Sequence, residues 1–363
     1  MQQSVYQLER CSWDITDRCP LNCAHCCAKK DTVGPELTHT EALSLVRQLI
    51  ALRVRSVSLT GGEPLVREDW PEIVRALSDG GIQVSLTTSG WTLDAATVGQ
   101  MRYSGLHQAA ISVDGPRDVH DQIRQPGSYD RFVRALQYLQ AVDIPVTVIT
   151  TVLRTNLDRL PQLRNELVRL GVKAWQLQLG VPVGNLKQRP QSVLDPRQMG
   201  PLIDFCYETA QSYPIRVFPA DGIGYYTQKD ALVRKHAMQS DALPVWRGCI
   251  GGKRLAHITS DGNVLGISMA VFEGDRGLRA NIRQRSLEAI WNDDRVFAEF
   301  RKFDCTQLEG LCRTCQYRDL CKGGCTMVRL SLGGGRYAEN PYCAYYQARR
   351  EDQAISYVEQ LPL

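Results

Sequence analysis

Three cysteines near the start of the chain restrict what it can fold into more than any other feature. Cys19, Cys23 and Cys26 lie in the run Cys-Pro-Leu-Asn-Cys-Ala-His-Cys, a CxxxCxxC pattern. Three soft thiolates this close together fit on one loop and suit an iron–sulfur cluster, but they do not complete a four-thiolate zinc site. One iron of a four-iron cluster would keep a free position for another ligand. The alternative is three incidental buried thiols.

Composition favours a globular enzyme. The 363 residues, 43% of them hydrophobic, suffice for a large domain and a smaller one. No apolar run approaches the roughly 18 residues of a membrane span, and no signal sequence is evident. The net charge of +4 is mild, without a basic stretch interleaved with aromatics, so we expect no nucleic-acid or membrane binding. We expect a cytoplasmic protein, in which the two dense groups among the 13 cysteines indicate metal binding rather than disulfides.

Hydrophobic periodicity alternates between strand and helix through the first half of the chain. We expect strands at 11–16, 55–59, 83–88, 108–113, 145–152 and 173–179, with helices at 38–52, 69–78, 93–103, 129–142 and 160–170. This alternation predicts an α/β fold with a mainly parallel sheet and right-handed crossovers. A loop over 180–190, a helix at 199–212 and a strand at 215–218 are expected to follow.

The run Thr60-Gly61-Gly62-Glu63-Pro64 follows the second expected strand. Its two glycines let the backbone approach a ligand closely, and the Glu63 carboxylate suits an ammonium group. Together with CxxxCxxC, this turn resembles the GGEP loop of the radical S-adenosylmethionine (SAM) enzymes. The resemblance implies a partial (β/α)6 barrel with a [4Fe–4S] cluster on the three cysteines and SAM on the open iron. It also implies reductive cleavage of SAM to a 5′-deoxyadenosyl radical, which takes hydrogen from a substrate.

Further SAM-binding residues are implied by the same resemblance. Gly61, Gly62, Glu63 and Pro64 would bind the SAM amino group. Ser89, Ser112 and Asp114 stand at strand ends that bind the SAM ribose and methionine in the family, although turn and cap chemistry also accounts for such residues. Arg124 lies where the family has an arginine-containing loop and would contact the SAM carboxylate; the alternative is a solvated charge.

A second group of cysteines lies near the end of the chain. It has the pattern CxxC-x5-CxxxC, formed by Cys312, Cys315, Cys321 and Cys325, with Cys343 further on and Cys249 upstream. These thiolates are enough for a complete four-cysteine metal site, for which a zinc ribbon is the rival. Asp261-Gly262 predicts a hairpin turn between the cysteines.

Beside the N-terminal motifs, this region resembles the SPASM domain, a C-terminal extension of radical SAM enzymes that holds up to two auxiliary [4Fe–4S] clusters. The resemblance implies a second auxiliary cluster on Cys312, Cys315, Cys321 and Cys343, and matches Cys249 and Cys325 to two ligands of the first. Where the family has a further cysteine after the hairpin, this chain reads Leu265-Gly-Ile-Ser268. Either Cys305 substitutes, or the first auxiliary cluster is altered or missing. We expect a radical SAM partial barrel at 1–190, a bridging segment at 191–248 and a SPASM domain at 249–363.

SPASM enzymes mostly act on peptides and proteins, so the leading hypothesis is an oxidoreductase that matures a ribosomally made precursor peptide. The reaction would be a C–C or thioether crosslink or an epimerisation. The alternatives are haem d1-type tetrapyrrole side-chain modification, anaerobic sulfatase maturation and, outside enzymes, a cluster-binding electron-transfer module. Expected partners are an external electron donor such as a flavodoxin or ferredoxin and, because only ten residues precede Cys11, a separate leader-binding protein. No catalytic acid or base is identified, although Asp221, Tyr225 and Glu273 lie in plausible regions.

Overall fold

A computed structural model describes residues 6–28, 34–240, 244, 246–267, 280–332 and 334–350. Ser268 and Glu273 lie outside these residues. The chain forms two compact units. The first comprises 1–112, 124–146 and 250–303, and the second comprises 113–123, 147–249 and 304–363. Neither unit coincides with one of the expected domains, whose boundaries stay a prediction.

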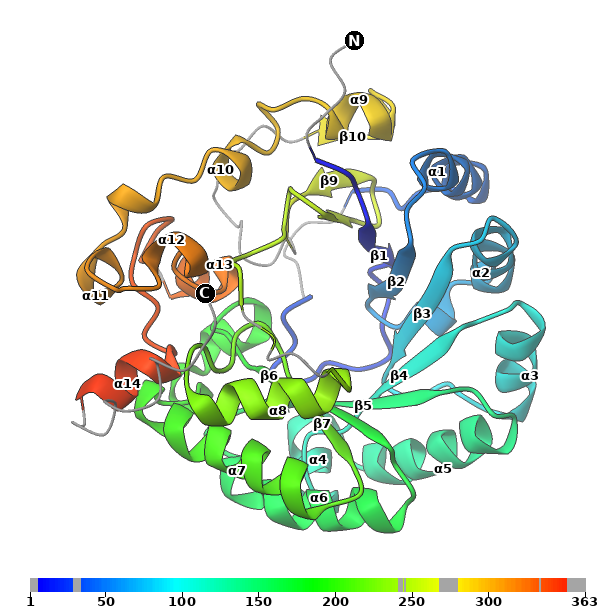
Figure 1. Cartoon of the computed structure of the whole chain (residues 1–363). Coiled ribbons are helices and arrows are strands. Elements are labelled where there is room, and N and C mark those ends of the chain that lie inside the picture. The colour runs from blue at the N-terminus through cyan, green and yellow to red at the C-terminus, as the bar shows by residue number, and fades with distance from the viewer. Residues whose placement is uncertain are drawn as a thin grey trace. The chain divides into compact units, whose positions relative to one another are not determined.

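A sheet organises the first unit (Figure 1). Its strands are β1 (Arg10–Thr16), β2 (Ser56–Gly61), β3 (Gln83–Thr88), β4 (Gln108–Ser112), β8 (Leu255–Ile258), β9 (Asn263–Leu265) and β10 (Ala280–Asn281), in the order β10-β9-β8-β1-β2-β3-β4. The pairs from β8 to β4 are parallel, whereas β8-β9 and β9-β10 are antiparallel. The hairpin around Asp261-Gly262 therefore forms as predicted, and it extends the parallel sheet at β1.

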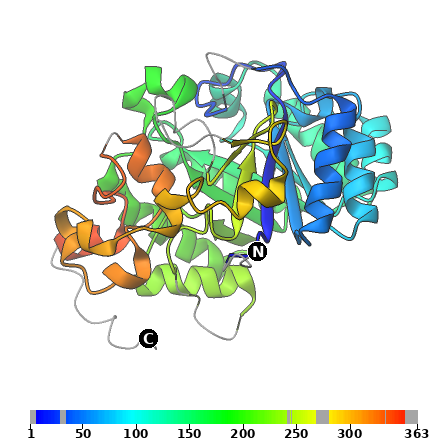
Figure 2. The same ribbon diagram turned by 90° about the horizontal axis from the view of Figure 1, so that it is seen from above.

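Helices cover one face of this sheet. They are α1 (His39–Ala51), α2 (Trp70–Asp79), α3 (Ala95–Tyr103), α5 (Ser128–Ala141), α9 (Leu287–Trp291) and α10 (Ala298–Arg301). Figure 2 shows α1 and α2, in blue, along one side of the first strands. Because side chains alternate along a strand, the buried Trp13 and Ile15 of β1 face these helices, while Asp14 points to the opposite face. That opposite face is polar, since Ser58 of β2 pairs with Ser85 of β3 through their hydroxyls at 2.9 Å.

The second unit contains a smaller parallel arrangement of β5 (Val146–Val152), β6 (Ala174–Leu179) and β7 (Arg216–Pro219). Its longer helices are α4 (Arg117–Ile123), α6 (Leu160–Arg169), α7 (Met199–Ser212) and α8 (Gln228–Met238). Four short helices carry the C-terminal cysteine region: α11 (Gly310–Arg313), α12 (Arg318–Cys321), α13 (Thr326–Ser331) and α14 (Ala344–Arg350). Helix α7 packs against both β7 and α8.

The α/β fold with a predominantly parallel sheet is confirmed, and the expected strands and helices form within a few residues of their predicted ends. The described helices that were not predicted are α4, α8 and the short helices from α9 to α14. Helix α4 is only seven residues long, and α8 lies in a stretch without a clear apolar period. None of the helices that the structure describes is long and apolar enough to cross a membrane.

Candidate active site

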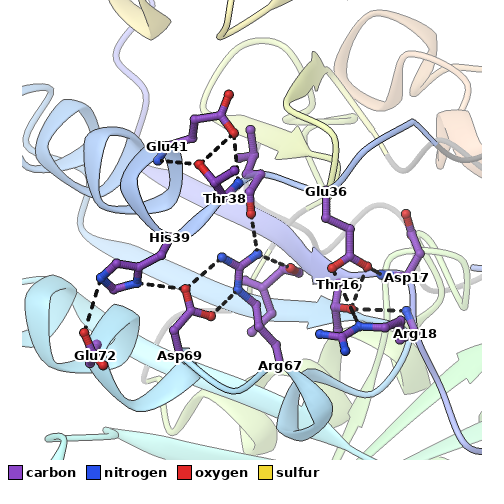
Figure 3. Close-up of polar contacts among 12 residues, drawn as sticks. Thr16, Asp17, Arg18, Glu36, Thr38, His39, Glu41, Arg67, Asp69 and Glu72 are labelled. Atoms are coloured by element: carbon purple, nitrogen blue, oxygen red, sulfur yellow. Dashed lines mark hydrogen bonds and ion pairs between the residues drawn. The ribbon is translucent and has the colours of Figure 1, made fainter.

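The loop with Cys19, Cys23 and Cys26 is anchored where it leaves β1 (Figure 3). One carboxylate oxygen of Glu36 accepts hydrogen bonds from the Thr16 hydroxyl at 2.7 Å and the Asp17 amide at 2.9 Å. Glu36 lies just beyond the loop, so these bonds join the chain before the cysteines to the chain after them. The loop is therefore closed at its base by a side chain whose role the sequence did not reveal.

Arg67 binds the same two chain segments from the other side (Figure 3). Its guanidinium donates to the carbonyl oxygens of Ile15 at 2.8 Å and Leu37 at 3.0 Å. The remaining nitrogens form a bidentate ion pair with Asp69, at 2.6 and 2.9 Å. Arg67 is 5% exposed. A buried, ion-paired guanidinium with good geometry thus fixes the two ends of the cysteine loop relative to each other.

The Gly61-Gly62-Glu63 turn contacts the cysteine loop directly. Gly62 donates its amide to the Thr16 carbonyl and Glu63 donates to the Arg18 carbonyl, both at 2.8 Å. A Cβ atom on Gly61 would lie 2.2 Å from the Thr16 oxygen, and one on Gly62 would lie 2.2 Å from the Arg18 oxygen. Gly61 also has φ of +126°, which favours glycine. The close approach expected of these glycines is therefore made, at least in part, to the cysteine loop itself.

Glu63 has the features expected of a ligand-binding carboxylate. Its Oε2 accepts from the Ser89 amide at 2.9 Å and the Ser89 hydroxyl at 2.5 Å, whereas its Oε1 is buried with no hydrogen-bond partner among the described residues. Burial raises the pKa of Glu63, and the Ser89 hydrogen bonds oppose that shift. A buried oxygen without a donor is costly unless a ligand supplies one, so this site fits an ammonium group such as that of SAM.

The three N-terminal cysteines and Arg124 lie near this turn. Cys23 is buried, Cys26 is half-buried and Cys19 is exposed. Although the Cys19 residue is exposed, partial desolvation of its thiol raises its pKa. Glu63 and Cys26 raise that pKa further, and Arg124 lowers it. The guanidinium of Arg124 lies 3.9 Å from the Cys23 sulfur. The first unit therefore brings the predicted cluster ligands, Glu63 and Arg124 together, and this donor set fits a three-cysteine cluster with SAM.

The other two predicted SAM contacts behave differently. Ser112 is half-buried at the end of β4. Asp114 belongs to the second unit and is fully buried there. Its carboxylate accepts from the Thr151 amide at 3.0 Å, and its carbonyl accepts from Asn156 at 2.7 Å. These bonds favour the turn and cap chemistry for Asp114; SAM binding by Ser89, Ser112 and Asp114 stays a prediction.

Sequence reasoning missed a polar group on the inner face of the first unit's sheet. Asp14 of β1 accepts a hydrogen bond from the Thr60 hydroxyl at 2.8 Å and lies 3.1 Å from Nε2 of His257 on β8. Asp14 is 6% exposed and His257 is 4% exposed. The signal in the sequence was a polar residue at alternate positions of an otherwise apolar strand. A buried carboxylate–imidazole pair can hold or release a proton.

In the second unit the structure gathers the predicted C-terminal cysteines. Cys343 interacts electrostatically with Cys312, Cys315 and Cys321, and these interactions add to the burial that raises its pKa. Burial raises the pKa of Cys321 and of Cys325 to about 12. Cys325 interacts in the same way with Cys249. We call Cys312, Cys315, Cys321 and Cys343 the four-thiol group, and Cys249 and Cys325 the second group; both stay predicted ligand sets.

No three His, Cys, Asp or Glu side chains among the residues the structure describes lie close enough to share a single metal ion. A four-iron cluster instead takes each cysteine on a different iron, so the four-thiol group fits such a cluster by its donor count and chemistry. The individual ligand assignments stay predictions.

Aromatic rings pack against three cysteines of the four-thiol group. Tyr225, Tyr226, Tyr317 and Tyr345 form a buried cluster against which Cys315, Cys321 and Cys343 pack. The rings of Tyr226 and Tyr317 are stacked, with centroids 4.1 Å apart. The Tyr225 hydroxyl accepts from the Cys325 amide at 3.0 Å and donates to the Asp221 carbonyl. Tyr225 has φ of +86°, a strained conformation for a bulky residue, so this segment is held by its surroundings.

Comparison with known proteins agrees with this arrangement. The radical SAM superfamily model matches residues 13–167, and the SPASM model, an iron–sulfur cluster-binding domain, matches residues 249–316. The AdoMet-dependent heme synthase of Methanosarcina barkeri is 28% identical over 352 residues, which cover 93% of this chain and 97% of that protein. The PqqA peptide cyclase of Granulibacter bethesdensis is 24% identical over 354 residues, which cover 94% of this chain and 89% of that protein. The structure of native anSMEcpe with bound AdoMet has a TM-score of 0.74 at 19% identity, covering 96% of each chain.

The chain is a radical SAM enzyme with a SPASM domain, and it has the radical SAM fold. The expected cofactors of these domains are confirmed: a [4Fe–4S] cluster with SAM for the first, and auxiliary iron–sulfur for the second. The SPASM match favours iron–sulfur over the zinc ribbon, and the similarity to enzymes along nearly the whole chain argues against a non-catalytic electron-transfer module.

Proposed function

We propose that this enzyme oxidatively modifies a side chain of a tetrapyrrole. The observation that carries the proposal is the similarity to the Methanosarcina barkeri heme synthase, which extends along 97% of that protein. The proposal reverses the order expected from the sequence, in which a peptide substrate came first and a tetrapyrrole second. Cytoplasmic location and an external one-electron donor such as a flavodoxin or ferredoxin belong to the same proposal.

When bound, the cluster and SAM supply abstraction of a hydrogen atom from an unactivated carbon of the substrate. The chain's own residues position these cofactors. Glu63, held by Ser89, would bind the SAM ammonium through its free Oε1, and Arg124, beside Cys23, would bind the SAM carboxylate. The clamp formed by Glu36 and Arg67 would keep the cysteine loop in register with this site.

Asp14 and His257 are the candidates for proton handling. Removing a hydrogen atom and then an electron from a substrate also requires a proton to leave, unless another group such as carbon dioxide departs. In an oxidation without loss of carbon dioxide, such as a crosslink, the Asp14 carboxylate, bound by Thr60, would orient the His257 imidazole as that acceptor. The pair lies on the polar face of the sheet, away from the covering helices.

The test uses the enzyme reconstituted with iron and sulfide under anaerobic conditions, with SAM and reductant, and an iron porphyrin that carries propionate side chains. The proposal predicts a porphyrin product that has lost carbon dioxide and two hydrogens from a propionate, in proportion to 5′-deoxyadenosine. An unchanged porphyrin, with SAM still cleaved, would contradict it.

A second candidate is maturation of a ribosomally made precursor peptide. The similarity to a PqqA peptide cyclase along 94% of this chain favours it. We would co-express the enzyme with the small peptide encoded beside its gene and weigh the peptide by mass spectrometry in ordinary and deuterated water. Loss of two hydrogens would support a crosslink or dehydrogenation, and incorporation of one deuterium only in deuterated water would support epimerisation. A separate leader-binding protein belongs to this second candidate only.

A further inference from the structure

Arg329 is a buried cation within the C-terminal cysteine region. It lies on α13 and is 1% exposed. One turn of helix joins it to Cys325, because its amide donates to the Cys325 carbonyl at 3.3 Å. Full burial of an arginine is uncommon and needs compensating negative charge or hydrogen bonds.

The guanidinium is fixed by backbone contacts. It donates to the carbonyl oxygen of Arg336 and, at 3.4 Å, to the hydroxyl of Thr326. A Cβ on Gly323 would lie 3.1 Å from its central carbon, and Gly323 has φ of +77°. Gly323 lies between Cys321 and Cys325 in sequence. The charge is therefore packed against the short turn that joins the two groups of thiols.

Thiols of both groups act on the pKa of Arg329. Burial lowers that pKa, and interactions with Cys312, Cys249, Cys325 and Cys321 raise it. The guanidinium packs against Gly323, which stands in sequence between Cys321 of the four-thiol group and Cys325 of the other. Arg329 therefore lies beside the turn that the two predicted ligand sets share. An arginine keeps its proton in such a site, because a guanidinium loses it only under strongly basic conditions.

We propose that Arg329 sets the reduction potential of the iron–sulfur cluster on Cys312, Cys315, Cys321 and Cys343, holding it more positive than the same cysteines would without a buried cation. A four-iron cluster with four thiolate ligands already has a net negative charge, and reduction makes that charge more negative. Here the reduction takes place beside packed aromatic rings, which have few mobile dipoles. A fixed positive charge at short range in such a medium stabilises the reduced form more than the oxidised form. The inference rests on the cluster predicted at these cysteines but not on the identity of the substrate.

The same cation has a second consequence for the incomplete ligand set. Cys249 and Cys325 raise the pKa of Arg329, and they lack the full set of cysteines that a first auxiliary cluster has in the family. Arg329 can act on these thiolates and on the complete set together. Its charge therefore reaches the complete cluster whether or not Cys249 and Cys325 hold iron.

The test compares Arg329→Gln and Arg329→Lys with the reconstituted full-length enzyme. Arg318→Gln serves as the matched control, because Arg318 lies on α12 in the same region but is only half-buried and is paired with the exposed Asp319. The potential of each cluster is measured by a reductive titration followed by electron paramagnetic resonance. Addition of SAM separates the signals, since only the N-terminal cluster should change its spectrum when SAM binds.

The proposal predicts that Arg329→Gln shifts the C-terminal cluster to a more negative potential at unchanged iron content. Arg329→Lys, which keeps the positive charge, should have a potential close to that of the wild type. Arg318→Gln should leave the potential unchanged. An unshifted potential in Arg329→Gln would overturn the proposal, as would equal shifts in the Gln and Lys variants or loss of the C-terminal cluster from both. None of these readouts needs a substrate, so their failure is distinct from failure of the tetrapyrrole or peptide assay.

Discussion

Charged side chains hold the N-terminal cysteine loop at its two ends, whereas aromatic rings pack against C-terminal cysteines. Glu36 and Arg67 bind the chain on both sides of Cys19, Cys23 and Cys26, and Cys19 itself is exposed. Around the four-thiol group, by contrast, Tyr226 and Tyr317 stack within a buried cluster. The difference matches the two tasks: a cluster with an open iron must admit SAM, whereas an electron-transfer cluster benefits from a dry, rigid surrounding.

The two regions should therefore respond differently to single substitutions. The N-terminal loop depends on a few polar contacts at its base, so single substitutions there should act on SAM chemistry. The C-terminal group depends on packing that many residues share, so single substitutions there should act in smaller steps.

The largest effect is expected from Gly62→Ala. The new Cβ would lie 2.2 Å from the Arg18 carbonyl oxygen, so either the turn or the cysteine loop must move. We expect SAM cleavage to fall at least about tenfold, equivalent to ~1.4 kcal/mol or more in the barrier. The matched control is Gly99→Ala on α3, where a Cβ has no heavy atom of the described residues within 4 Å and should stabilise by ~0.5–1 kcal/mol. Equal activity of the two variants would contradict this role for Gly62.

Arg67→Met should come next. It leaves the Ile15 and Leu37 carbonyls without the guanidinium donor and leaves the Asp69 carboxylate with His39 but without its bidentate ion pair, at a cost of about 3 kcal/mol. Iron should leave the N-terminal cluster faster in the presence of a chelator, while the C-terminal cluster keeps its wild-type rate. Arg75→Met is the control, because Arg75 lies over the Tyr103 ring on the surface and should cost less than about 1 kcal/mol. Equal loss of iron from both clusters would show that Arg67 supports the whole fold instead.

Glu63→Gln tests the site that the clamp positions. Loss of a charge-assisted hydrogen bond to the SAM ammonium should raise KM for SAM about 10- to 100-fold, with a smaller change in kcat. Steady-state kinetics of 5′-deoxyadenosine formation measure both constants. Ser89→Ala, which removes only the hydroxyl that supports Glu63, should raise KM less. A wild-type KM in Glu63→Gln would remove Glu63 from SAM binding.

The smallest effect is expected in the aromatic shell. Tyr226→Phe keeps the ring stack with Tyr317 and removes the hydroxyl that donates to the Trp246 carbonyl and interacts with Cys321, which should cost about 1 kcal/mol. Thermal unfolding should show a correspondingly small decrease, and SAM cleavage should stay at the wild-type rate. A large loss of SAM cleavage would break the proposed separation between the two regions.

Local patterns predicted much of this molecule. The helix at His39–Ala51, the strand at Gln83–Thr88 and the Asp261-Gly262 hairpin depend on residues close in sequence. The cysteine groups were also evident, because their spacing is itself the signal. The sequence could not predict contacts between residues that are far apart in the chain.

Arg67 shows why such contacts could not be predicted. Its partners are backbone carbonyls 52 and 30 residues away, which carry no mark in the sequence. The pairing of Asp14 with His257 spans 243 residues and depends on β8 joining β1, which only the sheet topology reveals. Arg329 likewise looked like one basic residue among many until its burial beside the cysteines was known.

The most direct test of the separation between the two regions compares Cys23→Ala with Cys315→Ala. Each reconstituted variant is assayed for 5′-deoxyadenosine formation from SAM and for the resonance signals of its clusters. We predict that Cys23→Ala abolishes SAM cleavage but keeps the C-terminal signal, and that Cys315→Ala loses the C-terminal signal but keeps part of the SAM cleavage. Retained cleavage in Cys23→Ala with full iron content, or loss of both properties in each variant, would contradict the account.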